Sequence, residues 1–450
     1  MLWNPLLFYA RRELSFRMRT YFPHLVCIVA LVSCAALIRV LLRKFLRTWL
    51  HEPLVFHAQK WMPIIGLCCT LLWALGTSLQ NYALIVFGAS LVVFVLIGAG
   101  MTLVSLPFAI GLLMLHARGG ASRHSQSANP LQEGNSASPS LLGHKDNSTS
   151  PPLRADKGGC DSEHNASNMS RREFLRNAAA AMPLLSTASG LSGMARSFEE
   201  VRLPVFHFQF ANLPAALQGL KICQLSDMHL GYFRGVRDME RLFERVAAQQ
   251  PDLVLVTGDI ADDLTLLPAT LRLLEALPAP LGVYASLGNH EYYRGIQNVR
   301  KYFDASAIPL LCNEGLALSV QNATLFIGGA DDPSRSRETD FAIFFPKTTE
   351  AALREASSDA FKILLSHRPQ SFYTAAELSA QLTLAGHTHG MQIGYNGRSL
   401  FERNGSEKLL WGHYQRGASQ LYTTSGVGHW FPFRLGCPPE APMIVLERSL

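Results

Sequence analysis

The sequence predicts an α/β domain that follows a helical membrane region, and two observations support this prediction. After about residue 198, short apolar runs end in polar clusters and alternate with segments of helical periodicity, as is typical of an α/β domain. Before residue 117, three long apolar runs follow one another with few charges. We therefore divide the 450 residues into a membrane region (1–116), a linker (117–169), a signal-like segment (170–197) and a C-terminal domain (198–450).

The three apolar runs cover residues 25–42, 62–79 and 82–115. Each of the first two is close to the ~20 residues that a membrane-spanning helix needs. The third run carries no charge, and at ~1.5 Å per residue it is longer than one hydrocarbon core requires. It is either one tilted helix or a tight pair, so the number of spans stays open.

The positive charge of the chain belongs to this amino-terminal region. The formal net charge is +6, and residues 1–60 hold nine Lys or Arg against two acids. These basic residues flank apolar runs and do not cluster on a soluble module, which favours a membrane setting over nucleic-acid binding. We therefore expect a membrane partner and no nucleic-acid partner.

Residues 117–169 are rich in Ser, Asn, Gly and Pro, which predicts a disordered linker because such a composition buries little apolar surface. Arg171 and Arg172 then precede Phe174, Leu175 and a weakly apolar stretch, a pattern that resembles a twin-arginine export signal. An ordinary membrane helix is the alternative. In either case the positive charges stay in the cytoplasm, so the domain that follows is expected outside it.

The C-terminal domain contains six apolar runs with the length and composition of strands. They cover residues 220–225, 253–257, 282–287, 324–328, 361–366 and 382–385. Helical periodicity is found between them, at residues 239–248, 265–276, 299–303, 350–356 and 369–378.

Clusters of metal-ligand side chains follow five of these strands. The first three strong strands end at such clusters, and open α/β sheets place their sites at these ends. A Gly-Asp pair or a lone His is weak evidence alone, but here five clusters occur in order. Together they supply seven candidate ligands: Asp227, His229, Asp259, Asn289, His367, His387 and His389.

These residue types define the kind of metal that is expected. Carboxylate oxygen, imidazole nitrogen and amide oxygen form a mixed set that suits borderline metals such as Mn, Fe or Zn. A shared carboxylate can bridge two cations about 3.5 to 4 Å apart. We therefore expect two divalent metal ions, whose identity the sequence leaves open.

The ordered blocks Asp-x-His, Gly-Asp, Gly-Asn-His-Glu, His and Gly-His-x-His, from 227 to 389, resemble the calcineurin-like metallophosphoesterase superfamily. The resemblance implies a two-layer β-sandwich core flanked by helices, and hydrolysis of a phosphoester by a metal-bridging hydroxide. It also implies one metal site from Asp227, His229 and His389, a second from Asn289, His367 and His387, and Asp259 as the bridge between them.

The same resemblance assigns roles to neighbouring residues. His290 is expected to bind phosphate and to protonate the leaving oxygen. Glu291 is expected to orient His290. Asp262 and Asp263 are interpreted as a solvated turn and not as further ligands.

Within the superfamily, the sequence is most similar to bacterial membrane-linked or exported phosphodiesterase-like proteins, through residues 225–231, 251–259 and 425–428. Met391 departs from that subgroup, which commonly has a second Gly there. That subgroup often carries amino-terminal membrane helices. With the apolar runs and the placement of positive charge, we expect a multi-pass protein of the bacterial cytoplasmic (inner) membrane with an extracytoplasmic site.

The leading functional hypothesis is hydrolysis of a phosphoester, in the first place a phosphodiester, that is free or lipid-linked. One alternative is pyrophosphate hydrolysis of a UDP-linked lipid precursor, which would need a cytoplasmic site. Another is a catalytically silent membrane sensor, which the intact ligand set disfavours. His429, Trp430, Phe431 and Phe433 form either a substrate patch or part of the core. The oligomeric state stays open.

Overall fold

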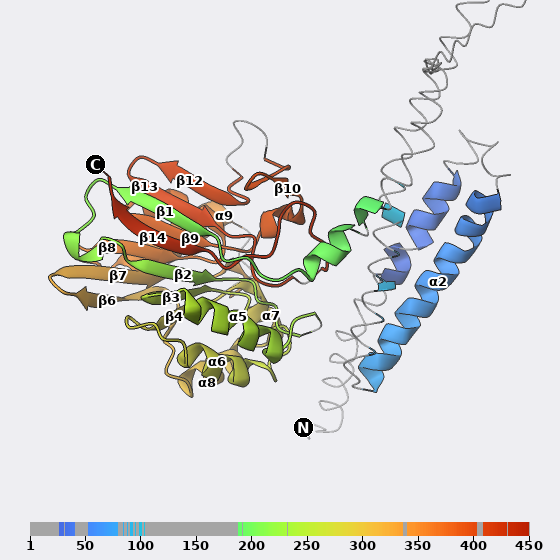
Figure 1. Cartoon of the computed structure of the whole chain (residues 1–450), viewed down its shortest axis with the longest axis horizontal. Coiled ribbons are helices and arrows are strands. Elements are labelled where there is room, and N and C mark those ends of the chain that lie inside the picture. Colours follow the sequence, from blue (N-terminus) through green and yellow to red (C-terminus); the bar gives the residue numbers. More distant parts are fainter. Residues whose placement is uncertain are drawn as a thin grey trace, which may run out of the picture.

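The computed structural model describes the C-terminal domain almost completely and the amino-terminal region in part (Figure 1). The described residues are 27–30, 32–40, 53–79, 188–190, 192–231, 233–335, 340–402, 408–429 and 431–449, with scattered helical residues between 84 and 103. The predicted linker and the Arg171-Arg172 pair lie outside these residues.

The described amino-terminal residues are helical. Residues 27–30 and 32–40 of the first apolar run lie in helix, and the second run lies within helix α2 (Pro53–Ser78) except for its last residue. Most of the third run lies outside the described residues. Among the residues that the structure describes, no helix has both the length and the apolar character that crossing a membrane requires.

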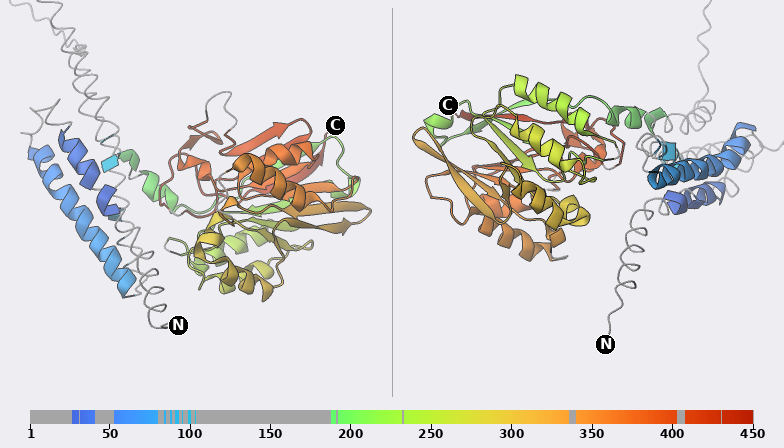
Figure 2. Two further views of the ribbon diagram at one scale, coloured as in Figure 1. Left: turned by 180° about the vertical axis from the view of Figure 1, so that it is seen from behind. Right: turned by 90° about the horizontal axis from the view of Figure 1, so that it is seen from below.

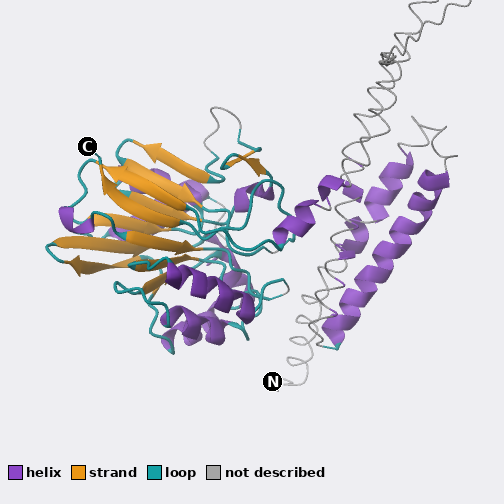
Figure 3. Ribbon diagram, viewed as in Figure 1, coloured by secondary structure: helices purple, strands orange, loops and turns teal. Residues whose placement is uncertain are grey.

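Two six-stranded sheets form the centre of the C-terminal domain (Figure 3). In spatial order, the first sheet contains β1 (Val205–Phe210), β14 (Met443–Arg448), β2 (Lys221–Leu225), β3 (Leu253–Thr257), β4 (Val283–Ser286) and β5 (Leu310–Leu311). The second contains β12 (Gly412–Arg416), β13 (Ser419–Thr423), β9 (Leu382–Ala385), β8 (Phe361–Leu365), β7 (Ala323–Gly329) and β6 (Glu314–Val320).

Each sheet has a parallel centre. Strands β2 to β5 run parallel, as do β7, β8, β9 and β13, whereas β14, β6 and β12 pair antiparallel with their neighbours in those runs. The carboxyl ends of the parallel strands within a sheet therefore meet at one edge, where their loops come together.

Alternate residues of the strands fill the space between the two sheets. Ile222 and Leu255 of the first sheet and Ile363 and Leu384 of the second belong to one buried cluster. Because side chains alternate across a strand, the intervening residues face the helices instead. The two packed sheets confirm the predicted α/β fold with a layered β core.

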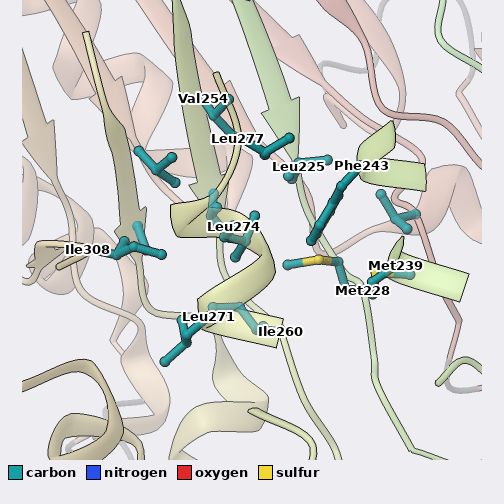
Figure 4. Close-up of a cluster of buried hydrophobic side chains, with 14 of the residues drawn as sticks. Leu225, Met228, Met239, Phe243, Val254, Ile260, Leu271, Leu274, Leu277 and Ile308 are labelled. Atoms are coloured by element: carbon teal, nitrogen blue, oxygen red, sulfur yellow. The ribbon is translucent and has the colours of Figure 1, made fainter. Parts of the chain in front are cut away.

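Helices cover the outer face of each sheet (Figure 2). Those on the first sheet are α5 (Val236–Ala248), α6 (Leu267–Glu275) and α8 (Ile296–Asp304), and those on the second are α9 (Phe341–Leu353) and α10 (Phe372–Glu377). In Figure 4, Leu225 and Val254 from the first sheet lie beside Phe243 of α5 and Leu274 of α6. Helix α5 thus buries its apolar face against the first sheet.

Short elements carry much of the loop structure at the strand ends. They are α7 (Asn289–Arg294), η2 (Ala215–Leu217), η3 (Pro333–Arg335), η4 (Pro369–Ser371), η5 (His389–Gln392) and the hairpin of β10 (Gly394–Tyr395) and β11 (Arg398–Ser399).

Candidate metal centre

The predicted ligands follow directly from the strand ends, and most have an unusual backbone. Asp227 comes just after β2, Asp259 just after β3 and Asn289 just after β4. Five of the seven have positive φ: Asp227 (52°), His229 (46°), Asp259 (52°), His387 (69°) and His389 (49°). Asp and His occupy this left-handed region more readily than most non-glycine residues. The backbone therefore turns sharply at each strand end.

One group of ligand atoms comes from Asp227, His229 and His389, which are all buried. The Nε2 atom of His389 lies 3.4 Å from Asp227 Oδ1 and 3.2 Å from His229 Nε2. Three atoms that can bind a cation thus face one another, and they belong to the three residues that the resemblance assigns to the first metal site.

The second group comes from Asp259, His367 and His387. Asp259 Oδ2 lies 3.1 Å from His367 Nε2, and this nitrogen lies 3.2 Å from His387 Nδ1. The same Asp259 oxygen lies 3.7 Å from His229 Nε2 in the first group. One carboxylate oxygen therefore reaches both groups, as a bridging ligand must.

Asn289 supplies the test of whether a cation fits. Its side chain is buried, and its Oδ1 atom has no hydrogen-bond partner among the described residues. An unpaired buried amide oxygen costs free energy unless it meets a donor or a cation. The candidate ligand atoms are carboxylate oxygen, amide oxygen and imidazole nitrogen, the set that Mn, Fe and Zn accept, so these residues fit two such ions.

Glycines allow the close approach of these loops. A Cβ atom at Gly288 would lie 2.3 Å from Asp259 Oδ1, and one at Gly386 would lie 2.2 Å from Asp227 Oδ2. Any larger residue would therefore displace a candidate ligand. This explains why glycine precedes Asn289 and His387 in the motif.

The ligand side chains shift one another's pKa values because they are buried and lie close together. Burial alone would raise the pKa of Asp259, but His367, His290 and His229 lower it well below its usual value. Burial lowers the pKa of His367, but Asp259 and Asp227 together raise it to about 10. Burial and the neighbouring His367 hold the pKa of His387 well below its usual value. The carboxylates thus provide a negative potential that attracts cations.

Asp262 corrects one prediction. It was interpreted as part of a solvated turn, but its side chain is only 7% exposed and lies inside the cluster. Its Oδ1 atom lies 2.5 Å from His290 Nδ1 and accepts from Arg294 at 2.9 Å, and its Oδ2 atom lies 3.2 Å from His229 Nδ1. It therefore positions both rings. Its spacing of three residues after Asp259 was the only signal in the sequence.

His290 is placed to act on a substrate. With Nδ1 held by Asp262, its Nε2 atom lies 3.9 Å from Asp259 Oδ2 and its side chain keeps 16% exposure. The ring thus reaches from the edge of the cluster toward solvent. This is the position that a phosphate-binding or proton-donating group needs.

Glu291 has a different task from the one predicted. Its carboxylate accepts hydrogen bonds from the backbone N–H groups of Asp259, Ile260 and Gly288. It therefore fixes the loop that follows β3 and does not orient the His290 ring directly.

Arg434 was not predicted as a site residue, yet it supports the loop beneath Asp227. It is fully buried and donates to the carbonyl oxygens of Ser425, Gly426 and Gly428. Its guanidinium nitrogen also lies 3.5 Å from His389 Nδ1. Because arginine retains its charge when buried, this contact places a positive charge beside the His389 ring.

The candidate substrate patch near the carboxyl end proves to be mainly core. His429 and Phe433 are buried at 1% and 6% exposure, and Phe433 packs on Met194 and Ile393. Trp430 lies outside the described residues. Of the two readings left open by the sequence, core packing is correct for His429 and Phe433.

A layered α/β domain with two adjacent His and Asp ligand groups at its strand ends has the architecture of a metal-dependent hydrolase. The family model described as calcineurin-like phosphoesterase matches residues 220–391. A metallophosphoesterase of Aquifex aeolicus is 30% identical over 257 residues, which cover 55% of this chain and 92% of that protein. The chain therefore belongs to the calcineurin-like metallophosphoesterases, hydrolases of phosphoester bonds in a family that depends on a dinuclear metal centre.

Other relatives differ in length. The metallophosphoesterase YkuE of Bacillus subtilis is 28% identical over 62% of this chain and 99% of its own length. A transmembrane protein with metallophosphoesterase domain from Bos taurus is 28% identical over 62% of this chain and 64% of that protein. Among solved structures, a dimetal phosphatase from Danio rerio has a TM-score of 0.30 at 13% identity, covering 46% of this chain and 88% of that one. This last likeness is too distant to support an argument.

Proposed function

We propose that this chain hydrolyses a phosphodiester with two divalent metal ions of the Mn, Fe or Zn type. One ion would be held by Asp227, His229 and His389, and the other by Asn289, His367 and His387. Asp259 would be shared between them. The single observation that supports this most is the Asp259 oxygen that reaches both groups. When bound, such ions supply an activated water and neutralise charge on the phosphoryl group.

The protein residues divide the remaining work. His290, held by Asp262 through Nδ1, presents Nε2 to bind a phosphoryl oxygen and to donate a proton to the leaving oxygen. The buried ligands exclude competing water from the cluster. Glu291 bonds the loop that carries Asp259. Arg434 bonds the 425–428 loop, whose backbone N–H groups at Val427 and Gly428 donate to Ser226 O and Asp227 O.

The charges beside the cluster favour a diester over a monoester. Arg294 pairs with Asp262, and Arg368 pairs with Asp332 at 2.7 Å. Both arginines are therefore neutralised by carboxylates. A diester carries one negative charge where a monoester carries close to two, so it needs fewer free cationic groups.

We further propose that the reaction takes place at the outer face of the cytoplasmic membrane. The long apolar runs of the amino-terminal region and the Arg171-Arg172 pair support this location. The exposed apolar side chains of α2, such as Ile64 and Leu71, also support a lipid environment for that helix. The bovine relative is named as a transmembrane protein.

The test is hydrolysis of bis-p-nitrophenyl phosphate against p-nitrophenyl phosphate by the full-length chain with Mn, Fe or Zn. Asp259→Asn and His387→Ala should each abolish turnover, and Asp263→Asn, an exposed neighbour, should retain it. Faster monoester hydrolysis would replace the diester assignment. No turnover with any of the three metals would favour the UDP-linked lipid pyrophosphate or a catalytically silent sensor.

A further inference from the structure

A group of apolar side chains stands exposed directly after the last candidate ligand. Met391, Tyr395, Leu400 and Phe401 are 51%, 77%, 64% and 45% exposed. They lie on the segment that starts at His389 with η5 and continues through the β10–β11 hairpin. We call these four residues the apolar lip. Monomeric soluble proteins rarely expose such neighbouring apolar groups without an interaction to make.

The lip is held in a defined position. Gly394 donates to Leu435 O at 2.9 Å, and Leu400 donates to Ile393 O at 3.0 Å. Asn396 and Gly397 have φ of 49° and 74°, as the tight turn of a two-residue hairpin requires. The exposure of the lip therefore comes from an ordered hairpin that presents its side chains outward.

The base of the lip is joined to the segment that leads to the amino-terminal helices. Ile393 packs in one cluster with Phe433 and Met194, and Arg434 N donates to Gly193 O at 2.7 Å. Nearby, Phe233 packs with Cys69 and Trp73 of the helical region. The chain thus leaves the domain beside the lip.

The figures show the consequence for the whole molecule. The β10 hairpin lies on the side of the domain that faces helix α2, and the β6–β7 hairpin lies at the opposite end (Figures 1 and 2). Exposed apolar side chains of α2 and of the lip are therefore on the same side of the catalytic domain.

We propose that the apolar lip rests on the lipid surface and that the site takes amphiphilic phosphodiesters whose tails remain in the membrane. This inference rests on the proposed function, because it specifies the substrate class of the same site. His389 begins the lip segment, so contact of Met391 and Leu400 with lipid holds the ligand cluster at the level of the headgroup phosphates. Apolar side chains and a helical anchor on one side are the features of an interfacial contact.

The first test compares two diesters with the same leaving group, methyl p-nitrophenyl phosphate and dodecyl p-nitrophenyl phosphate. The full-length chain is reconstituted in phosphatidylethanolamine and phosphatidylglycerol vesicles. Leu400→Ser with Phe401→Ser should lower kcat/KM for the dodecyl ester about tenfold and leave the methyl ester within about twofold. Leu400→Met with Phe401→Leu, which stays apolar, should retain both activities. Equal effects of the serine pair on the two esters would overturn the proposal.

The second test needs no activity and therefore separates this inference from the proposed function. Tyr395→Cys and Asn322→Cys, the latter in the β6–β7 turn, are labelled with a membrane-impermeant maleimide and quantified by mass spectrometry. In vesicles, the Tyr395→Cys variant should be labelled about tenfold more slowly at its new thiol than the Asn322→Cys variant. Equal rates would exclude lipid contact. Protection that depends on protein concentration and not on lipid would indicate a second copy of the chain, and would also overturn the proposal.

Discussion

Asp262→Asn is the substitution that tests the architecture of the site most directly. The change keeps the size of the side chain but removes the charge that lies 2.5 Å from His290 Nδ1 and 3.2 Å from His229 Nδ1. The asparagine amide has an NH2 end, and this end would face the Nδ1–H of one of the two rings. It would therefore disfavour the tautomer in which that ring carries its proton on Nδ1 and leaves Nε2 free. Two rings with different tasks therefore lose the same support.

The expected magnitude follows from these two contacts. Loss of the partner of a metal-binding histidine typically costs about 10- to 100-fold in metal affinity or activity. Misplacement of a proton donor adds part of the ~10²- to 10⁴-fold contribution of acid–base catalysis. We therefore expect kcat/KM for bis-p-nitrophenyl phosphate to fall about 100- to 1,000-fold, with metal affinity about tenfold weaker.

The assay compares Asp262→Asn with Asp263→Asn, because Asp263 is the adjacent carboxylate and accepts hydrogen bonds from the N–H and the hydroxyl of Thr265, outside the ligand cluster. Metal titrations and the pH–rate profile are measured for both variants. Activity of Asp262→Asn within threefold of the Asp263→Asn control, with unchanged metal affinity, would refute the positioning role.

Three further predictions concern single residues. Gly288→Ala should abolish turnover and lower bound metal, because the new Cβ would lie 2.3 Å from Asp259 Oδ1; elemental analysis showing full metal content would contradict this. His290→Asn should lower kcat about 10²- to 10⁴-fold while metal stoichiometry is unchanged, and a loss of metal would instead make it a ligand. Burial raises the pKa of Glu440, so its neutral form contributes stability that is present below the usual Glu pKa and lost as pH rises through the raised one. Chemical denaturation should therefore show Glu440→Gln gaining stability relative to the native chain as the pH rises above the usual Glu pKa, and a difference that stays constant with pH would disprove the assignment.

The sequence was most informative where local pattern and tertiary packing agree. Strands β3 and β9 begin and end at the predicted residues because a short apolar run between polar loops permits few alternatives. Helix α9 was predicted only from residue 350, yet it begins at Phe341. Its first turns contain Phe, Ile and Pro346, which argue locally against a helix, and packing of Ala352 and Leu353 against the second sheet outweighs that preference.

The strands that were not predicted show two reasons why a strand can be missed in a sequence. In the segment VFHFQF of β1, apolar and polar side chains alternate as in a half-buried strand, so this strand was predictable from its sequence. In contrast, GHYQR of β12 has no apolar alternation. It becomes a strand because the apolar neighbour β13 offers it a complete set of backbone partners, from Gly412–Thr423 to Arg416–Ser419.

For the candidate site, residue type and order were readable but the cause of the geometry was not. The five ligands at positive φ each hold a backbone conformation that costs of the order of 1–3 kcal/mol, so the surrounding structure must impose it. The groups that do so are Glu291, which bonds the loop at Asp259, and Arg434, which bonds the 425–428 loop that in turn donates to Asp227 O. Neither binds a metal ion in the proposed centre, and neither can be chosen from spacing alone. Their contacts imply that the ligands are held in place by the folded loops before a cation binds, since each loop is fixed by hydrogen bonds that do not involve the ligand atoms facing the centre.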